Sequence, residues 1–214
     1  MFDHPPLGFT GLDRNKPVTI RHRHLPHWRQ EGATYFVTFR LADSLPRSKL
    51  DQLREERERW LRNHPHPTDE ETQERLRKHM QQIEQWLDQG SGSCVLRGER
   101  AAGLAEGRLR HFDGDRYALF SFVIMPNHVH ACLKPLGHYD VDEILQAWKS
   151  VSAGLINRSI ARRGRLWQDE SFDRIVRDSE HLRRVVKYIE ANPAKANAAA
   201  WCWTTPAWNA WLGR

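Results

Sequence analysis

The stretch Arg116–Leu133 of the 214-residue chain, RYALFSFVIMPNHVHACL, decides the fold. Aromatic and β-branched residues dominate its first part, which predicts a strand over residues 116–124. Met125-Pro126-Asn127 makes a tight connection, and residues 128–133 predict the next strand. Two strands joined by a tight connection are the centre of the predicted sheet.

The rest of the chain supplies one strand before this pair in the sequence and one strand after it, together with several helices. Residues 34–41 alternate apolar and polar side chains and predict a first strand, and residues 172–177 predict a last short one. Apolar residues three and four apart predict helices at 48–63, from Thr68 to Gly90, at 99–110, 142–160 and 179–191. The order of these elements predicts an α+β domain, with helices packed on a mainly antiparallel sheet.

We interpret residues 1–214 as one domain with three additions to its core. Residues 1–32 are rich in Pro, His and Arg and predict an irregular basic arm. Residues from about 46 to 110 form a helical insertion between the first two strands, and residues 197–214 form a Trp-rich tail. We expect this tail to cover the core rather than to stack on bases.

Composition narrows the classes of function. The formal charge of +6 and a pI near 9.5 favour a polyanionic partner such as nucleic acid. No apolar run approaches the roughly 18 residues of a membrane span, so we expect no membrane association. The three scattered cysteines argue against a disulfide framework and favour a reducing cytoplasm.

His128 and His130 are the first candidates for chemistry. Residues two apart on a strand point to the same face, so both imidazoles project together while Val129 enters the core. Such a pair is a natural metal chelate, but twelve histidines make coincidental pairs common. Two further pairs, which lie in Pro-rich and Arg-rich segments, are His22 with His24 and His64 with His66.

Tyr188 and Asn192 are the second candidates. Tyr188 lies in the predicted helix at 179–191, and Asn192 directly follows that range. The two residues are four apart, so they lie on one flank of the apolar stripe of the helix. Arg184 lies one turn before Tyr188. The structural alternative is that Tyr188 is a core-edge residue and that Asn192 simply ends the helix before Pro193.

Together, these motifs resemble the REP-associated tyrosine transposases. The resemblance is carried by Met-Pro-Asn-His-Val-His (125–130), followed about sixty residues later by Tyr-Ile-x-x-Asn-Pro-x-x-Ala (188–196). Two further runs, LWQDESFDR (166–174) and VRDSEHLR (176–183), also match. The long insertion at 46–110 and the tail sequence WCWTT depart from the family pattern, which leaves the DNA specificity and the oligomeric state open.

The family belongs to the single-tyrosine HUH (His-hydrophobic-His) nucleases, which also include insertion-sequence transposases. The resemblance implies a ferredoxin-like HUH core, with His128, His130 and Asn192 as metal ligands and Tyr188 as nucleophile. It further implies Mg²⁺ or Mn²⁺, although the two imidazoles alone would equally suit Zn²⁺. The implied substrate is single-stranded or hairpin DNA with a REP-like repeat, cut through a 5′-phosphotyrosine by a monomer or homodimer.

Basic residues near these motifs are candidates for DNA binding. The loop at 162–167 places arginines beside an aromatic ring, which suits phosphate contacts with base stacking. A solvated loop and a flexible arm are the structural alternatives. The candidates are Arg162, Arg163, Arg165, Trp167, Arg184, Lys149, Arg21 and Arg23.

Two other functions remain open at this point. One is a catalytically silent, domesticated nucleic-acid-binding module, although pure binding does not require a Tyr, an Asn and two His. The other is a metal-dependent phosphodiesterase that uses water, with Tyr188 in a structural role. A covalent protein–DNA adduct distinguishes these alternatives from the tyrosine nuclease.

Overall fold

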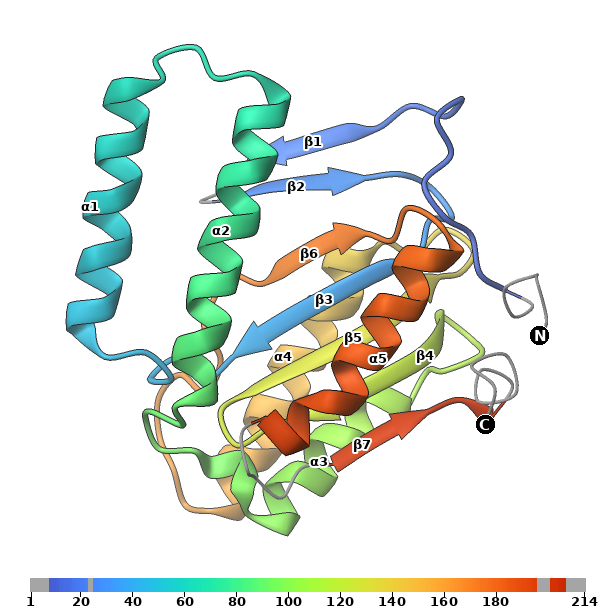
Figure 1. Cartoon of the computed structure of the whole chain (residues 1–214). Coiled ribbons are helices and arrows are strands. Elements are labelled where there is room, and N and C mark those ends of the chain that lie inside the picture. The colour runs from blue at the N-terminus through green and yellow to red at the C-terminus, as the bar shows by residue number, and fades with distance from the viewer. Residues whose placement is uncertain (1–7, 23–24, 196–200, 207–214) are drawn as a thin grey trace.

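A five-stranded antiparallel sheet forms the centre of the molecule (Figure 1). The computed structural model describes residues 8–22, 25–195 and 201–206. The strands lie in the order β6-β3-β5-β4-β7, and every neighbouring pair is antiparallel. Their bounds are Tyr35–Arg40 (β3), Tyr117–Ile124 (β4), His128–Pro135 (β5), Phe172–Ile175 (β6) and Trp201–Thr204 (β7).

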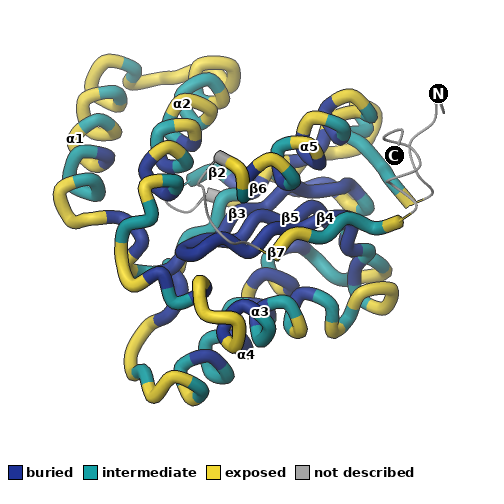
Figure 2. Tube along the Cα trace, turned by 60° about the horizontal axis from the view of Figure 1, so that its bottom comes forward, coloured by how far each residue is buried: buried dark blue, intermediate teal, exposed yellow. Residues whose placement is uncertain are grey.

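Helices cover both faces of this sheet. The helices of the described residues are α1 (Arg47–Asn63), α2 (Asp69–Asp88), the short 3-10 helix η1 (Val95–Arg97), α3 (Glu99–Arg110), α4 (Val141–Ser159) and α5 (Ser179–Lys195). Figure 2 shows α5 on one face and α3 with α4 on the other. The succession β3, helices, β4, β5, α4, β6 is the β-α-β-β-α-β arrangement of ferredoxin-like folds. The predicted α+β class is therefore confirmed.

Side chains along β5 alternate between the face that packs in the main core and the face that carries the candidate site. Val129, Ala131 and Leu133 are fully buried in the cluster under α3 and α4. Cys132 belongs to the smaller cluster under α5, and His128 and His130 share its face. The strand thus buries its aliphatic residues on one side and presents both imidazoles to α5 on the other.

The predicted insertion contains the helical hairpin α1–α2, which stands beside the edge strand β6 (Figure 1). The hairpin has its own small core, in which Leu53, Ile83 and Leu87 pack together and Phe172 of β6 closes one side. Thr68 caps α2 with Glu71 in the predicted capping box.

The structure corrects the predicted ends of the chain. The arm at 1–32 is not irregular throughout, because β1 (Thr19–His22) and β2 (Pro26–Arg29) pair as a hairpin. The tail contains β7, and its Trp203 stacks on Phe122 of β4, in agreement with a covering role. Trp208 and Trp211 lie outside the described residues.

Helix α5 also differs from its predicted extent. It runs through Pro193 to Lys195 instead of ending at about residue 191. Proline lacks a backbone N–H, so one helical hydrogen bond is missing there, but Asn192 in the last turn is fully buried against the rest of the protein. Among the helices of the described ranges, none has both the length and the apolar character that crossing a bilayer requires.

Candidate active site

His128 and His130 lie side by side on β5, beneath α5. Their exposed fractions are 1% and 0%, and their ring centroids are 4.7 Å apart with the planes at 76°. The two rings therefore converge within a space that bulk water does not fill, as the HxH spacing predicts.

Asn127 fixes the orientation of His128. The Nδ2 of Asn127 donates hydrogen bonds to the carbonyls of Leu87 and Ser91, both at 3.2 Å. Its Oδ1 must then accept from Nδ1 of His128, at 2.8 Å, which leaves the lone pair on Nε2. Burial lowers the pKa of His128 to about 3, so this imidazole is neutral at physiological pH. A neutral imidazole with a fixed tautomer is the form that binds metals.

His130 is held in a similar way. Its Nδ1 lies 2.7 Å from Oγ1 of Thr38, the residue directly opposite on β3. Its Nε2 lies 3.4 Å from the hydroxyl of Tyr188 on α5. Phe36 stacks against the ring of His130 at 5.5 Å. The Nε2 atom therefore faces the candidate nucleophile.

Tyr188 projects from α5 toward the histidines. Its ring meets Phe36 edge-on at 5.9 Å and is partly buried. Burial raises the pKa of the phenol well above its usual value, and the negative charge of Glu84 raises it further, whereas the side chain of Asn192 lowers it. In the resting protein, Tyr188 is therefore a neutral phenol beside a carboxylate.

Asn192 lies one helical turn beyond Tyr188 and is fully buried. Its Nδ2 donates to the Tyr188 carbonyl at 2.8 Å, which fixes the orientation of the amide. Its Oδ1 is buried and has no hydrogen-bond partner within the described part of the chain. An orphaned buried acceptor is costly, so a ligand that satisfies it is expected. Two imidazoles and one amide oxygen make a donor set that fits a divalent cation.

Four residues near this site were not predicted from sequence. Asn127 and Thr38 orient the two histidines, and Glu84 and Asp88 place negative charge near Tyr188. Only Asn127 carried a signal, because it directly precedes His128. Glu84 and Asp88 look like the solvated face of a charged helix until the packing of α2 is known.

The structure corrects one predicted DNA contact. Trp167 is only 4% exposed, packs edge-on against Phe39 and donates from Nε1 to Ser152. Its ring is part of the core and is not available to stack on a base. The prediction failed because an indole next to arginines looks the same in sequence whether it faces the core or the solvent.

The other basic candidates for DNA binding differ in whether their side chains are already bound by other residues of the chain. Arg163 is exposed, and Arg184 is exposed beside Glu180 at 3.4 Å. Arg165 pairs with Asp169 at 2.7 Å on the surface, and Arg162 donates to the Arg165 carbonyl. The loop at 162–167 is joined to β3 by the hydrogen bond that Gln168 N donates to Arg40 O, and Arg40 lies opposite His128 in the sheet. The loop thus lies near the end of the sheet that holds His128.

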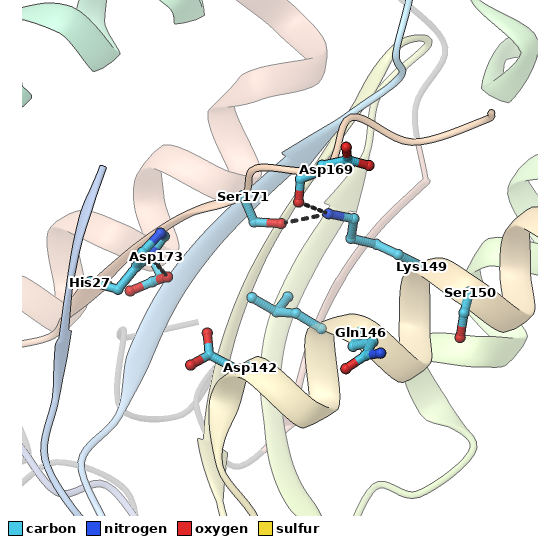
Figure 3. A pocket seen from close by; sticks show the side chains of 9 residues that line it. His27, Asp142, Gln146, Lys149, Ser150, Asp169, Ser171 and Asp173 are labelled. Carbon is cyan, nitrogen blue, oxygen red and sulfur yellow. Dashed lines mark hydrogen bonds and ion pairs between the residues drawn. The ribbon is translucent and has the colours of Figure 1, made fainter. Parts of the chain in front are cut away.

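Lys149 and Arg21 are bound by other residues of the chain, on the α4 side of the sheet. Lys149 donates to the Asp169 carbonyl and to Ser171, and it lines a pocket of about 350 Å³ (Figure 3). Arg21 pairs with Asp140 and Asp142. Arg23 lies outside the described residues. This pocket is separate from the histidine pair, and its carboxylates Asp142 and Asp173 already pair with Arg29.

The pair His64 and His66, which the structure describes, is not organised as a site. His64 stacks on Trp60 and bonds the Trp60 carbonyl at the tip of the helical hairpin, and His66 is exposed. His24 lies outside the described residues.

Comparisons with known proteins point to one family. Residues 95–192 match the sequence model described as "Transposase IS200 like". No protein with a curated description matches the chain. The matched span contains His128, His130, Tyr188 and Asn192, whereas β3 and the α1–α2 hairpin precede it.

Two solved structures are similar in part. A REP-associated tyrosine transposase bound to a REP hairpin is 16% identical, with a TM-score of 0.45 over 82% of this chain and 73% of its own. A proposed transposase from Deinococcus radiodurans R1 is 18% identical, with a TM-score of 0.38 over 74% of this chain and 89% of its own. Over residues 95–192, this chain is therefore similar in sequence to the IS200-like transposases.

Proposed function

We propose that the chain is a metal-dependent endonuclease that cuts single-stranded DNA through a covalent bond to Tyr188. The observation that carries this proposal is the position of the Tyr188 hydroxyl, 3.4 Å from Nε2 of His130. A tyrosine at the core edge has no need of a neighbouring histidine pair or of the unsatisfied oxygen of Asn192.

Each residue has a separate role in this reaction. His128, His130 and Asn192 would hold Mg²⁺ or Mn²⁺, which would polarise the scissile phosphate and offset charge on the leaving oxygen. The Tyr188 oxygen forms a bond to phosphorus while the bond from phosphorus to the 3′ oxygen breaks. The products are a 5′-phosphotyrosine and a free 3′-hydroxyl, so the phosphodiester is conserved for rejoining.

We propose single-stranded or hairpin DNA with a REP-like repeat as the substrate. The chain carries a formal charge of +6, and Arg163 and Arg184 are exposed. Unpaired bases are available for stacking and direct contact, which duplex DNA does not offer. The similarity of residues 95–192 to the IS200-like transposase model supports a DNA substrate.

The test is the formation of an adduct. We expect a 3′-labelled hairpin oligonucleotide, incubated with the protein and Mn²⁺, to give a labelled band of protein size on a denaturing gel. Tyr188→Phe deletes one hydroxyl and keeps the ring, so we expect it to abolish the adduct and to preserve DNA affinity.

The other outcomes discriminate between functions. Cleavage without an adduct would indicate a phosphodiesterase that uses water. Binding without cleavage by the wild-type protein would indicate a silent binding module. An adduct that persists in Tyr188→Phe would exclude this residue as the nucleophile.

A further inference from the structure

Arg40 is the last residue of β3 and lies directly opposite His128 on β5. Residues opposite each other in an antiparallel pair have their Cβ atoms about 4.5–5.5 Å apart on one face of the sheet. Phe36 and Thr38 precede Arg40 at intervals of two, and both contact His130 on that face. Arg40 therefore belongs to the sheet face that carries the candidate site.

The guanidinium of Arg40 is only partly used within the protein. Its Nη1 donates to Oγ of Ser44 at 3.0 Å and to the carbonyl of Leu41 at 3.5 Å. Nε and Nη2 donate to no atom in the described part of the chain, and neither of them is fully buried. Because a guanidinium is a planar fork of five N–H donors, the side that bears Nε and Nη2 can bind one phosphate through two parallel hydrogen bonds.

Arg40 is half-buried, and no carboxylate forms an ion pair with it in the ranges that the structure describes. Arg29 shows the opposite arrangement, because its buried guanidinium pairs with both Asp142 and Asp173. Taking a charge out of water is costly unless an opposite charge meets it. Burial lowers the pKa of Arg40 to about 10, so this side chain is still a cation at neutral pH. A half-buried cation with two open donors favours an anionic ligand.

The backbone around Arg40 is held on both sides. The carbonyl of Arg40 accepts a hydrogen bond from Gln168 N at 2.8 Å, and the next amide, Leu41 N, donates to the carbonyl of Asn127 at 2.8 Å. The position of Arg40 relative to His128 is thus fixed before a ligand binds. A contact made from such a position costs less conformational entropy than one made from a flexible loop.

Tyr188 and Arg40 lie at opposite ends of this group of side chains. Tyr188 contacts Phe36 and His130. Arg40 lies four residues beyond Phe36, or about 13 Å along β3. In phosphoryl transfer, the attacking and leaving oxygens lie roughly in line at phosphorus. With Tyr188 as the nucleophile, the leaving 3′ oxygen therefore points toward the end of the site where Arg40 and His128 lie.

We propose that Arg40 binds the DNA phosphate that lies one nucleotide to the 5′ side of the scissile phosphate, which we call the preceding phosphate. This inference rests on the proposed function and adds a substrate contact to it. In this role, Arg40 holds the strand that leaves with a free 3′-hydroxyl. That strand then stays beside the 5′-phosphotyrosine, where its hydroxyl is in position for rejoining.

DNA affinity is the direct readout of this contact. Cleavage by the wild-type protein first locates the scissile bond in the hairpin oligonucleotide. Binding is then measured in Tyr188→Phe, which keeps the DNA intact. We expect the further change Arg40→Gln to weaken binding by about tenfold to a hundredfold, because a charged bidentate contact is lost. The log–log salt slope should fall by about 0.7, the value for one phosphate of a single strand.

Arg77→Ala is the matched control for loss of a positive charge. Arg77 is exposed on α2 and pairs with Glu74 at 2.6 Å. We expect Arg77→Ala to change neither the affinity by more than twofold nor the salt slope.

A neutral methylphosphonate in place of one phosphate identifies the phosphate that Arg40 contacts. At the preceding phosphate, it should weaken binding to Tyr188→Phe by a factor similar to that of Arg40→Gln. The two changes together should cost no more than either alone, because they remove the same contact. At the phosphate that follows the scissile one, the effect of Arg40→Gln should keep its full size. The arm with Arg40 intact tests the proposal even where Arg40→Gln folds poorly.

A purely structural role for Arg40 predicts a different result. Ser44→Ala removes the hydroxyl that Nη1 of Arg40 contacts and keeps the guanidinium. If Arg40 only held the turn after β3, Ser44→Ala would weaken DNA binding as much as Arg40→Gln does. We expect Ser44→Ala to bind within threefold of its parent and to keep its sensitivity to the neutral preceding phosphate.

The outcomes distinguish this inference from the function on which it rests. Binding by Arg40→Gln within twofold of its parent would overturn the role of Arg40 and leave the tyrosine nuclease intact. An Arg40→Gln defect that persists when the preceding phosphate is neutral, or that disappears only when another phosphate is neutral, would have the same meaning. Absence of any adduct from the wild-type protein would overturn both proposals, since cleavage defines the scissile bond.

Discussion

Two buried histidines on opposite faces of the sheet are held by opposite kinds of partner. His27 on β2 lies between two carboxylates, with Nδ1 2.6 Å from Asp173 and Nε2 2.8 Å from Glu170. His128 on β5 has the neutral amide of Asn127 as its partner. Burial opposes charge on both rings. The pKa of His27 is nevertheless raised by Asp173 and Glu170, whereas that of His128 falls to about 3.

The surroundings of His27 form a closed cluster of charges. Arg29 donates to both Asp142 of α4 and Asp173 of β6, so this arginine joins β2 to two other elements. Figure 3 shows His27 and Asp173 side by side. Each charged group meets one of opposite sign, which is what buried charges need to be tolerated. The cluster explains why β1 and β2 form an ordered hairpin instead of a flexible arm.

The surroundings of His128 leave capacity for a ligand. The tautomer of His128 leaves a lone pair on Nε2, and the buried Oδ1 of Asn192 has no partner in the described ranges. The comparison teaches how to separate two kinds of buried polar cluster. A cluster that satisfies all its members stabilises the fold, and one that leaves acceptors open indicates a binding site.

The largest effect should come from removing a candidate metal ligand from the cluster of His128, His130 and Asn192. We expect His128→Ala and His130→Ala each to reduce metal-dependent adduct formation by about a thousandfold or more, because several kcal/mol of charge stabilisation are lost. Adduct yield against Mn²⁺ concentration measures this effect. His64→Ala combined with His66→Ala is the control and should behave as wild type.

A substitution in the charged cluster around His27 should instead lower the free energy of unfolding. Asp173→Ala leaves Arg29 and His27 without their shared carboxylate, so we expect a loss of about 3–5 kcal/mol in the free energy of unfolding. Urea denaturation measures this loss, and the variant that remains folded should form the adduct at the normal rate. A loss below about 1 kcal/mol would contradict the structural role of the cluster.

The smallest effect concerns the charge of His27. Its raised pKa means that the stabilisation from its protonated form is fully present below the unfolded pKa of about 6.5. That stabilisation is lost as the pH rises through the folded pKa. We therefore expect the advantage of wild type over His27→Gln in urea to be largest near pH 6 and to shrink toward pH 9. An advantage that grows with pH would show that His27 is neutral.

Local periodicity was enough to predict the residues that face one another within one element. His128 and His130 share a strand face and Tyr188 and Asn192 share a helix flank, so spacing alone groups each pair. The position of Thr38 depends on the register of β3 with β5, which no local pattern encodes. The position of Glu84 depends on how α2 meets the sheet, and its surroundings in sequence are those of any charged helix.

The β1–β2 hairpin was missed for a different reason. Its strands contain proline, histidine and arginine, and they are only four residues long. Both strands are held in place by tertiary interactions, namely the ion pair of Arg29 with Asp173 and the contact of β2 with β6. Strand propensity is weak where packing and ion pairs determine the structure.

The attachment of α2 at one end only has a consequence for how this chain can change in length. Hydrogen bonds from Asn127 to the Leu87 and Ser91 carbonyls hold the sheet end of the hairpin, whereas the connection between α1 and α2 lies at its far end (Figure 1). Residues gained or lost in that connection leave the register at Glu84 intact. One residue gained or lost after Glu84 would rotate the helix by about 100° and turn this carboxylate away. Variation in length is thus tolerated at one end of the hairpin and excluded at the other.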